Sequence, residues 1–188
     1  MRTYSQLIHD QNQLNDFLGT ISWQTSKQYL VQLLSTQSQE EATSFAQCLL
    51  EVVPHAHVIG HSARTLIYSG DIFTDGSLLI VSELVDTTLT SAVQTYSFSP
   101  DIDGYDLKQS LALRDNSKAI ISFSVQVERR DYPIYRGFCS DGPPVSGGLA
   151  QANEGGCWVL FQTQCYEHAA VAVACLLYTS PSPRDLAV

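Results

Sequence analysis

Residues that could do chemistry gather in the segment 54–72. An apolar run, Val58-Ile59, stops at Gly60-His61-Ser62, and a second β-prone run follows at Thr65–Tyr68. A strand that ends in an exposed polar corner offers free backbone N–H groups and short hydroxyls to a small molecule. We therefore take four residues of this corner as candidate ligand-binding residues: Gly60, His61, Ser62 and Arg64.

A serine nucleophile is one chemistry that the corner would suit. Gly60-His61-Ser62-Ala63 is similar to the nucleophile elbow of α/β-hydrolases, but Arg64 stands where the elbow has its second glycine. The base would have to be His168, the only histidine after the corner. A serine-dependent hydrolase using Ser62 and His168 is kept as an alternative. The expectation is an exposed turn serine and no catalytic residue.

Three histidines near the corner could bind a metal. In an extended chain His55, His57 and His61 would share one face. However, His61 would lie roughly 13–20 Å from the other two along the strand, too far for one ion. The five cysteines contain no C-x-x-C pair, so they give no zinc site either. We expect no metal and no cofactor.

A second candidate region lies far along the chain. Residues 137–156 hold six of the eleven glycines, together with Pro143 and Pro144. Such a segment could form a nest of backbone N–H groups for a carboxylate or phosphate, or simply a tight turn packed on a sheet. It has neither the P-loop nor the dinucleotide-binding spacing. Its candidate ligand-binding residues are Ser146, Gly147, Gly148 and Asn153.

The elements that must position these residues can be located from hydrophobic periodicity. Ser38 and Glu41 form a capping box, and apolar residues at helical spacing follow until Pro54. With a buried strand at 28–34 and another at 57–61, this predicts a βαβ unit, which places ligands at the carboxyl ends of its strands. Further helices are expected near 10–21 and 105–114, with a short one at 132–139. The segments 157–163 and 169–176 are expected to form a hairpin. The predicted fold class is mixed α/β (α+β), a single domain with one or more sheets flanked by helices.

Composition limits the partners. A net charge of −9 and a pI near 4.8 disfavour nucleic acid and anionic membrane surfaces. The longest apolar run, 169–177, is about half the length needed to cross a bilayer. An odd cysteine count without paired spacing suits a reduced cytoplasm. Residues 177–188 resemble translated sequencing-adapter read-through. We therefore expect a non-native tail there, and a natural protein that continued further.

Two segments together resemble the N-terminal FIST domain, a sensory module of bacterial signalling proteins and of some F-box proteins. The first is Pro54–Ile72, a proline, an apolar strand, Gly-x-Ser and a glycine-bearing turn. The second is Pro143–Ala150, which is similar to the family's Gly-Gly-x-Ala loop. The resemblance covers nearly all of residues 1–176. It implies a non-catalytic domain that binds a small ligand, such as an amino acid, and signals to a C-terminal FIST domain and an output module.

The site hypothesis joins the two regions. The corner 60–64 is expected to face the loop 146–153. Backbone N–H groups of a Gly147-Gly148 turn and the Arg64 side chain would bind a carboxylate, because an acidic protein needs local donors to hold an anion. Ser62 and either Asp71 or Asp75 would bind an amino group. The remaining alternative is a protein-interaction module, which would expose a contiguous apolar patch in place of a pocket.

Overall fold

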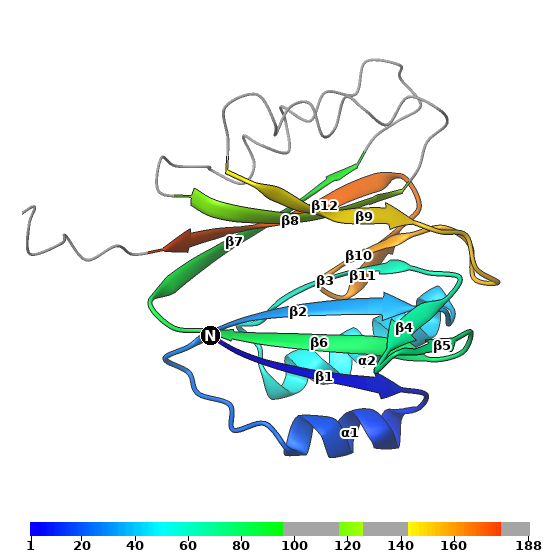
Figure 1. Cartoon of the computed structure of the whole chain (residues 1–188), viewed down its shortest axis with the longest axis horizontal. Coiled ribbons are helices and arrows are strands. Elements are labelled where there is room, and N and C mark those ends of the chain that lie inside the picture. The colour runs from blue at the N-terminus through cyan, green and yellow to red at the C-terminus, as the bar shows by residue number, and fades with distance from the viewer. Residues whose placement is uncertain (96–116, 126–142, 178–188) are drawn as a thin grey trace, which may run out of the picture.

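The protein is built in three layers. The computed structural model describes residues 1–95, 117–125 and 143–177. Two helices cover one face of a six-stranded sheet, and a four-stranded sheet covers its other face (Figure 1). This is the mixed α+β architecture that the sequence predicts. Within the described residues, no helix has the length and hydropathy needed to span a membrane.

The six-stranded sheet has the order β1-β6-β2-β3-β10-β11. Its strands are Arg2–Ile8, Ser77–Leu84, Gln28–Ser35, His57–Ser62, Val159–Phe161 and Gln164–Tyr166 in that order. The four-stranded sheet has the order β7-β12-β8-β9. Its strands are Thr87–Thr95, Ala169–Leu177, Ser117–Val125 and Val145–Ala150.

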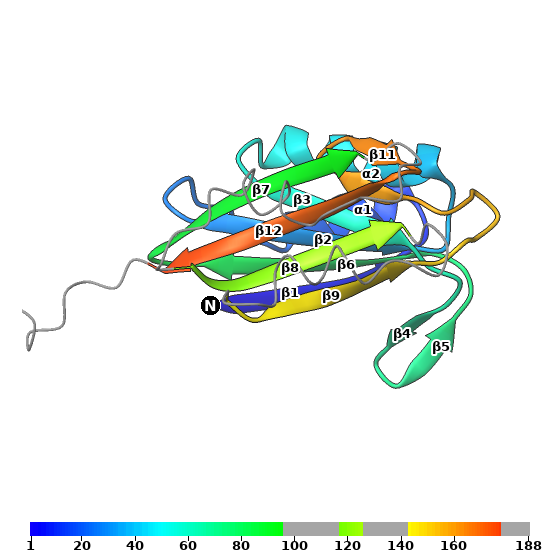
Figure 2. The same ribbon diagram turned by 90° about the horizontal axis from the view of Figure 1, so that it is seen from above.

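A separate hairpin, β4 (Leu66–Tyr68) with β5 (Asp71–Phe73), projects from the body (Figure 2). Its exposed Ile67 and Ile72 face each other across the two strands.

The predicted βαβ unit is confirmed. Helix α2 (Gln39–Val52) begins at the predicted capping box, in which Ser38 Oγ accepts from Glu41 N at 3.2 Å and Ser38 N donates to Glu41 Oε2 at 3.1 Å. Strands β2 and β3 run parallel, with Ser35 opposite Ser62 at their carboxyl ends. Both strands are buried between the helices and the second sheet, so polar groups concentrate at their ends.

The helix predicted near 10–21 is α1 (Gln11–Gly19), whose first turn is capped by Asp10 Oδ1 accepting from Gln13 N at 2.9 Å. The helices expected at 105–114 and 132–139 lie outside the described residues. Strand β12 extends to Leu177, the first residue of the expected tail; residues 178–188 lie outside the described part.

The hairpin predicted between 157–163 and 169–176 is wrong. Strand β10 instead pairs with the short β11 across a two-residue turn, with Phe161 opposite Gln164 and Gln162 at a positive φ of 53°. Strand β12 crosses to the other sheet and lies between β7 and β8. Small alanines leave room for packing along β12, and its Val171 and Val173 join the core between the two sheets. Local turn signals could not show which sheet the strand would join.

Two histidines of β3 lie in this layer between the sheets. His57 Nδ1 is 2.8 Å from Ser91 Oγ of β7, and the His61 ring lies 4.6 Å, centroid to centroid, from that of Phe123 on β8. His61 Nδ1 is 2.8 Å from the Ser62 carbonyl oxygen. Because that oxygen only accepts, Nδ1 carries the hydrogen. Burial lowers the pKa of both imidazoles, with His55 adding repulsion at His57 and the Ser62 carbonyl partly opposing the shift at His61.

Stability is therefore expected to fall in mild acid. The unfolded chain binds protons near the ordinary histidine pKa of about 6.5, whereas the folded chain resists protonation until the pH is lower. The free energy of unfolding should be greatest above about pH 6.5 and decrease as the pH falls below it. Urea unfolding at several pH values would measure this. His61→Leu should weaken the pH dependence, whereas Ile67→Ala, which changes an exposed residue without a titratable group, should leave it unchanged. If the free energy of unfolding depended on pH equally in both variants, His61 would not be a source of that dependence.

Candidate functional site

A cleft of about 820 Å³ opens at the carboxyl ends of β2 and β3. Four segments form its walls: the β2–α2 connection with the first turn of α2, the β3–β4 connection, the turn before β6 and the loop after β9. The lining residues are Thr36, Gln37, Ser38, Glu41, Arg64, Thr74, Asp75, Ala152, Asn153, Glu154 and Gly155. The volume falls within the range of small-molecule pockets, and the position is the one that a βαβ unit predicts.

The structure brings three of the predicted site residues to this cleft: Arg64, Asn153 and Asp75. Arg64 is exposed and makes no hydrogen bond or ion pair with any described residue. It is also the only lysine or arginine among the described lining residues, where Glu41, Asp75 and Glu154 supply carboxylates. Within the part of the chain that the structure describes, the cleft thus combines one cation that has no partner with three carboxylates.

The side chain of Asn153 already makes hydrogen bonds within the protein. Its Nδ2 donates to the carbonyl oxygens of Gln37 at 2.9 Å and Ser35 at 3.3 Å, and its Oδ1 accepts from Gly155 N at 2.8 Å. Both amide hydrogens are used, which leaves one oxygen lone pair for a ligand. The side chain therefore ties the loop after β9 to the end of β2 and shapes the cleft wall.

Ser62 is not the exposed turn serine that the sequence predicts. It is the last residue of β3, and its exposed fraction is zero. Its Oγ donates to Trp158 O at 3.3 Å and accepts from Trp158 N at 3.0 Å. Both bonds join β3 to the start of β10, so the hydroxyl holds two strands together. Ser62 does not line the cleft, and neither does Asp71.

Gly60 and His61 do not line the cleft either. His61 lies between the sheets, as described above. A Cβ at Gly60 would be 2.1 Å from the carbonyl oxygen of Leu33 on the neighbouring strand β2. Glycine is therefore needed here for the close approach of two parallel strands.

The predicted Gly147-Gly148 turn is wrong. Ser146, Gly147 and Gly148 belong to β9, which pairs in parallel with β8, with Gly147 opposite Ser122 and Gly148 opposite Phe123. Residues 145–150 therefore form the edge strand of the four-stranded sheet, and this segment is not a nest of N–H groups for a ligand. The two predicted regions still meet beyond the strands, because Gln151 N donates to the Ser62 carbonyl oxygen at 2.9 Å.

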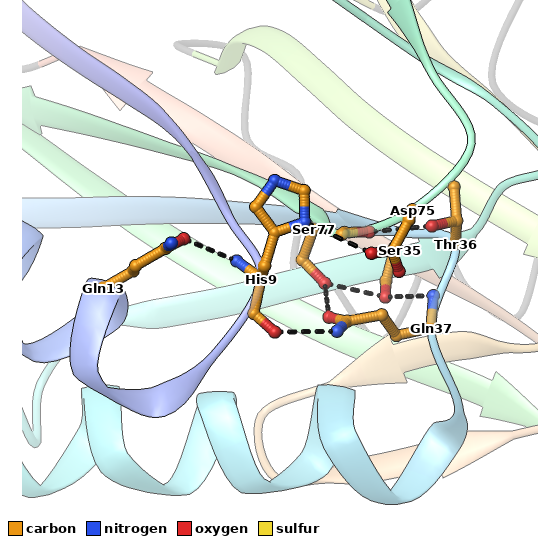
Figure 3. Close-up of polar contacts among 8 residues, drawn as sticks. His9, Gln13, Ser35, Thr36, Gln37, Asp75 and Ser77 are labelled. Atoms are coloured by element: carbon orange, nitrogen blue, oxygen red, sulfur yellow. Dashed lines mark hydrogen bonds and ion pairs between the residues drawn. The ribbon is translucent and has the colours of Figure 1, made fainter.

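A polar network that supports the cleft wall, and to which Gln37 and Asp75 of the lining belong, was missed by sequence reasoning (Figure 3). Ser35 and Ser77 are both fully buried, and their hydroxyl oxygens lie 2.8 Å apart. Gln37 connects them to the first strand: its N donates to Ser35 Oγ, its Oε1 lies 2.9 Å from Ser77 Oγ, and its Nε2 donates to His9 O at 3.1 Å. His9 Nδ1 in turn faces Asp75 Oδ2 at 3.4 Å. A polar strand end, Ser35-Thr36-Gln37, is the only local signal of this network.

The two glycines of β9 offer a matched test of the strand assignment. Gly147 has φ 145°, and a Cβ there would be 1.7 Å from the Ser122 carbonyl oxygen, whereas a Cβ at Gly148 would contact nothing within 4 Å. Gly147→Ala should lower the free energy of unfolding by about 1–3 kcal/mol or more. Gly148→Ala should change it by less than about 1 kcal/mol. Chemical denaturation of the two variants measures both. A turn at this position would predict similar, small effects.

The FIST N domain family matches residues 29–181 of the chain. Among curated proteins none matches it. A solved structure of cyanuric acid hydrolase, described as an evolutionary innovation by structural concatenation, superposes with a TM-score of 0.40 and 9% identity, over 94% of this chain and 68% of its own. That likeness is too low to support an argument about function. The family match covers well over half of the sequence and agrees with the motifs around Pro54–Ile72 and Pro143–Ala150. The protein belongs to the FIST N domain family, a family of sensory domains.

Proposed function

We propose that this chain is a non-catalytic cytoplasmic sensory domain whose cleft binds a small zwitterion, an amino acid or a molecule of similar charge. One observation carries the proposal: the guanidinium of Arg64, which has no partner among the described residues, lines the same cleft of about 820 Å³ as Asp75 and Glu154. Occupancy would be passed to a C-terminal FIST domain and an output module. The family membership supports the sensory role.

The charges of the cleft suggest a role for each group. Arg64 would bind the ligand's carboxylate through charge-assisted hydrogen bonds. The ammonium group would be bound by Asp75, whose side chain is 80% exposed, or by Glu154. Glu41 is less suited, because its Oε2 already accepts from both Ser38 N and Ser38 Oγ.

The position of Ser62 supports a non-catalytic domain. A serine nucleophile needs an accessible oxygen and a base within hydrogen-bond reach. The hydroxyl of Ser62 is buried and bonded to both backbone groups of Trp158. No observation on the described residues favours the hydrolase alternative, in which His168 would be the base.

A thermal-shift screen against the amino acids tests the proposal. A ligand present at a hundredfold its dissociation constant should stabilise the chain by about 2.7 kcal/mol. Arg64→Gln should weaken binding of the best ligand by roughly tenfold to a hundredfold, because a charge-assisted bond contributes about 1.5–3 kcal/mol. Lys118→Gln removes the same charge from β8, outside the cleft, and should bind like the unmodified chain.

Two outcomes would contradict the zwitterion proposal. One is a folded chain that no amino acid stabilises; this favours the interaction-module alternative, for which Ile67 and Ile72 offer exposed apolar side chains. The other is a ligand whose affinity falls equally in Arg64→Gln and Lys118→Gln. That result would place the ligand elsewhere or make net charge the cause.

A further inference from the structure

A second hollow lies on the other side of His9 from the cleft. It has a volume of about 700 Å³ and is formed by β1, α1 and the projecting β4–β5 hairpin. Three aromatic rings line it, one from each of α1, β4 and β5: Phe17, Tyr68 and Phe73. Leu7 of β1 adds an apolar wall. We refer to this hollow as the aromatic groove.

The rings of the aromatic groove are anchored yet partly open. Phe17 is 9% exposed, because it belongs to the core beneath α1. Tyr68 and Phe73 are half-buried. The Tyr68 hydroxyl donates to the Ser5 carbonyl oxygen at 3.0 Å, which fastens the hairpin to the edge of β1. Tyr68 and Phe73 thus line the groove on a hairpin that is already held in place.

The polar groups of the groove favour a positive ligand. Asp16 of α1 supplies a carboxylate, and no lysine or arginine is found among the described lining residues. The amide donor of Gln6 is directed to Leu7 O at 3.3 Å, and the Thr20 hydroxyl donates to Phe17 O at 2.7 Å. His9 Nδ1 is paired with Asp75. An anion would therefore find few donors, whereas a cation would find the Asp16 carboxylate and the half-buried rings of Tyr68 and Phe73.

We propose that the aromatic groove binds a small organic cation of the alkylammonium class. Ring faces attract an ammonium group through their quadrupole, and a nearby carboxylate adds a direct charge interaction. The net charge of −9 raises the local concentration of such a ligand. This site is separate from the zwitterion cleft, so it stands whether or not the proposed function holds.

Choline and its uncharged isostere 3,3-dimethylbutan-1-ol are the probes that separate charge from shape. Titration of each into the chain, followed by amide chemical shifts, should show choline perturbing residues of β1, α1 and the hairpin. The isostere should bind roughly twofold to thirtyfold more weakly, the range expected for a cation–π contact. Equal affinities would overturn the proposal, as would choline shifts centred on Arg64.

Variants of the groove complete the test. Asp16→Asn and Phe73→Leu should each weaken choline binding several-fold. Asp16 is exposed and caps no helix, so its variant is expected to fold even if the Phe73 variant loosens the hairpin. Glu51→Gln removes one exposed charge from α2 and is the control for net charge. Choline binding that is unchanged in Asp16→Asn, or reduced equally in Glu51→Gln, would refute the assignment.

Discussion

The ends of two buried parallel strands determine the shape of the site. Strands β2 and β3 are covered on both faces, so the carbonyl groups where they stop need partners from other segments. Ser35 O accepts from Ala63 N at 2.7 Å and from Asn153 Nδ2, and Ser62 O accepts from Gln151 N at 2.9 Å. These bonds bring the loop after β9 across the carboxyl end of the sheet. The cleft wall therefore forms because the carbonyl oxygens at the ends of these two strands need hydrogen-bond donors.

The predictions that succeeded depend on signals that are local in the chain. The capping box at Ser38 and Glu41, the apolar stripe behind it and Pro54 together specify α2, and α2 makes β2 and β3 parallel. The predictions that failed depend on distant partners. Glycine at 147 is typical of a turn and of a crowded strand alike, and only the backbone of Ser122 decides between them. Likewise, nothing near Ser62 in the sequence indicates that Trp158 will bury its hydroxyl.

The residues of the candidate site also differ in whether local sequence signals could identify them. Arg64 and Asn153 could be named from their polar, turn-like surroundings. Gln37 could not, because its importance comes from His9, which follows β1, and Ser77 of β6, and the chain brings these residues to Gln37 only in the folded sheet. A glutamine between two polar residues is commonplace in a loop. Its place in the wall of a cleft, bonded to two distant segments, is a property of the topology.

The electrostatics of α2 explain why a bare anion suits the cleft poorly. A helix N-terminus normally attracts negative charge. Here Glu40 and Glu41 already occupy the first turn, and Glu41 closes the capping box. Arg64 is then the single strong attraction for a carboxylate among the described lining residues, opposed by Asp75 and Glu154. A ligand that carries its own ammonium group turns those two carboxylates from repulsive neighbours into partners.

The two hollows share one wall, and that wall is ordered before any ligand arrives. Gln37 uses every polar group it has: its N, Oε1, Nε2 and carbonyl oxygen contact Ser35, Ser77, His9 and Asn153 respectively. His9 stands on the opposite side of this wall and lines the aromatic groove. Binding to a preformed surface costs little side-chain ordering, which raises affinity for a given set of contacts. Because the same few hydrogen bonds hold both surfaces, their loss would loosen the cleft and the aromatic groove together.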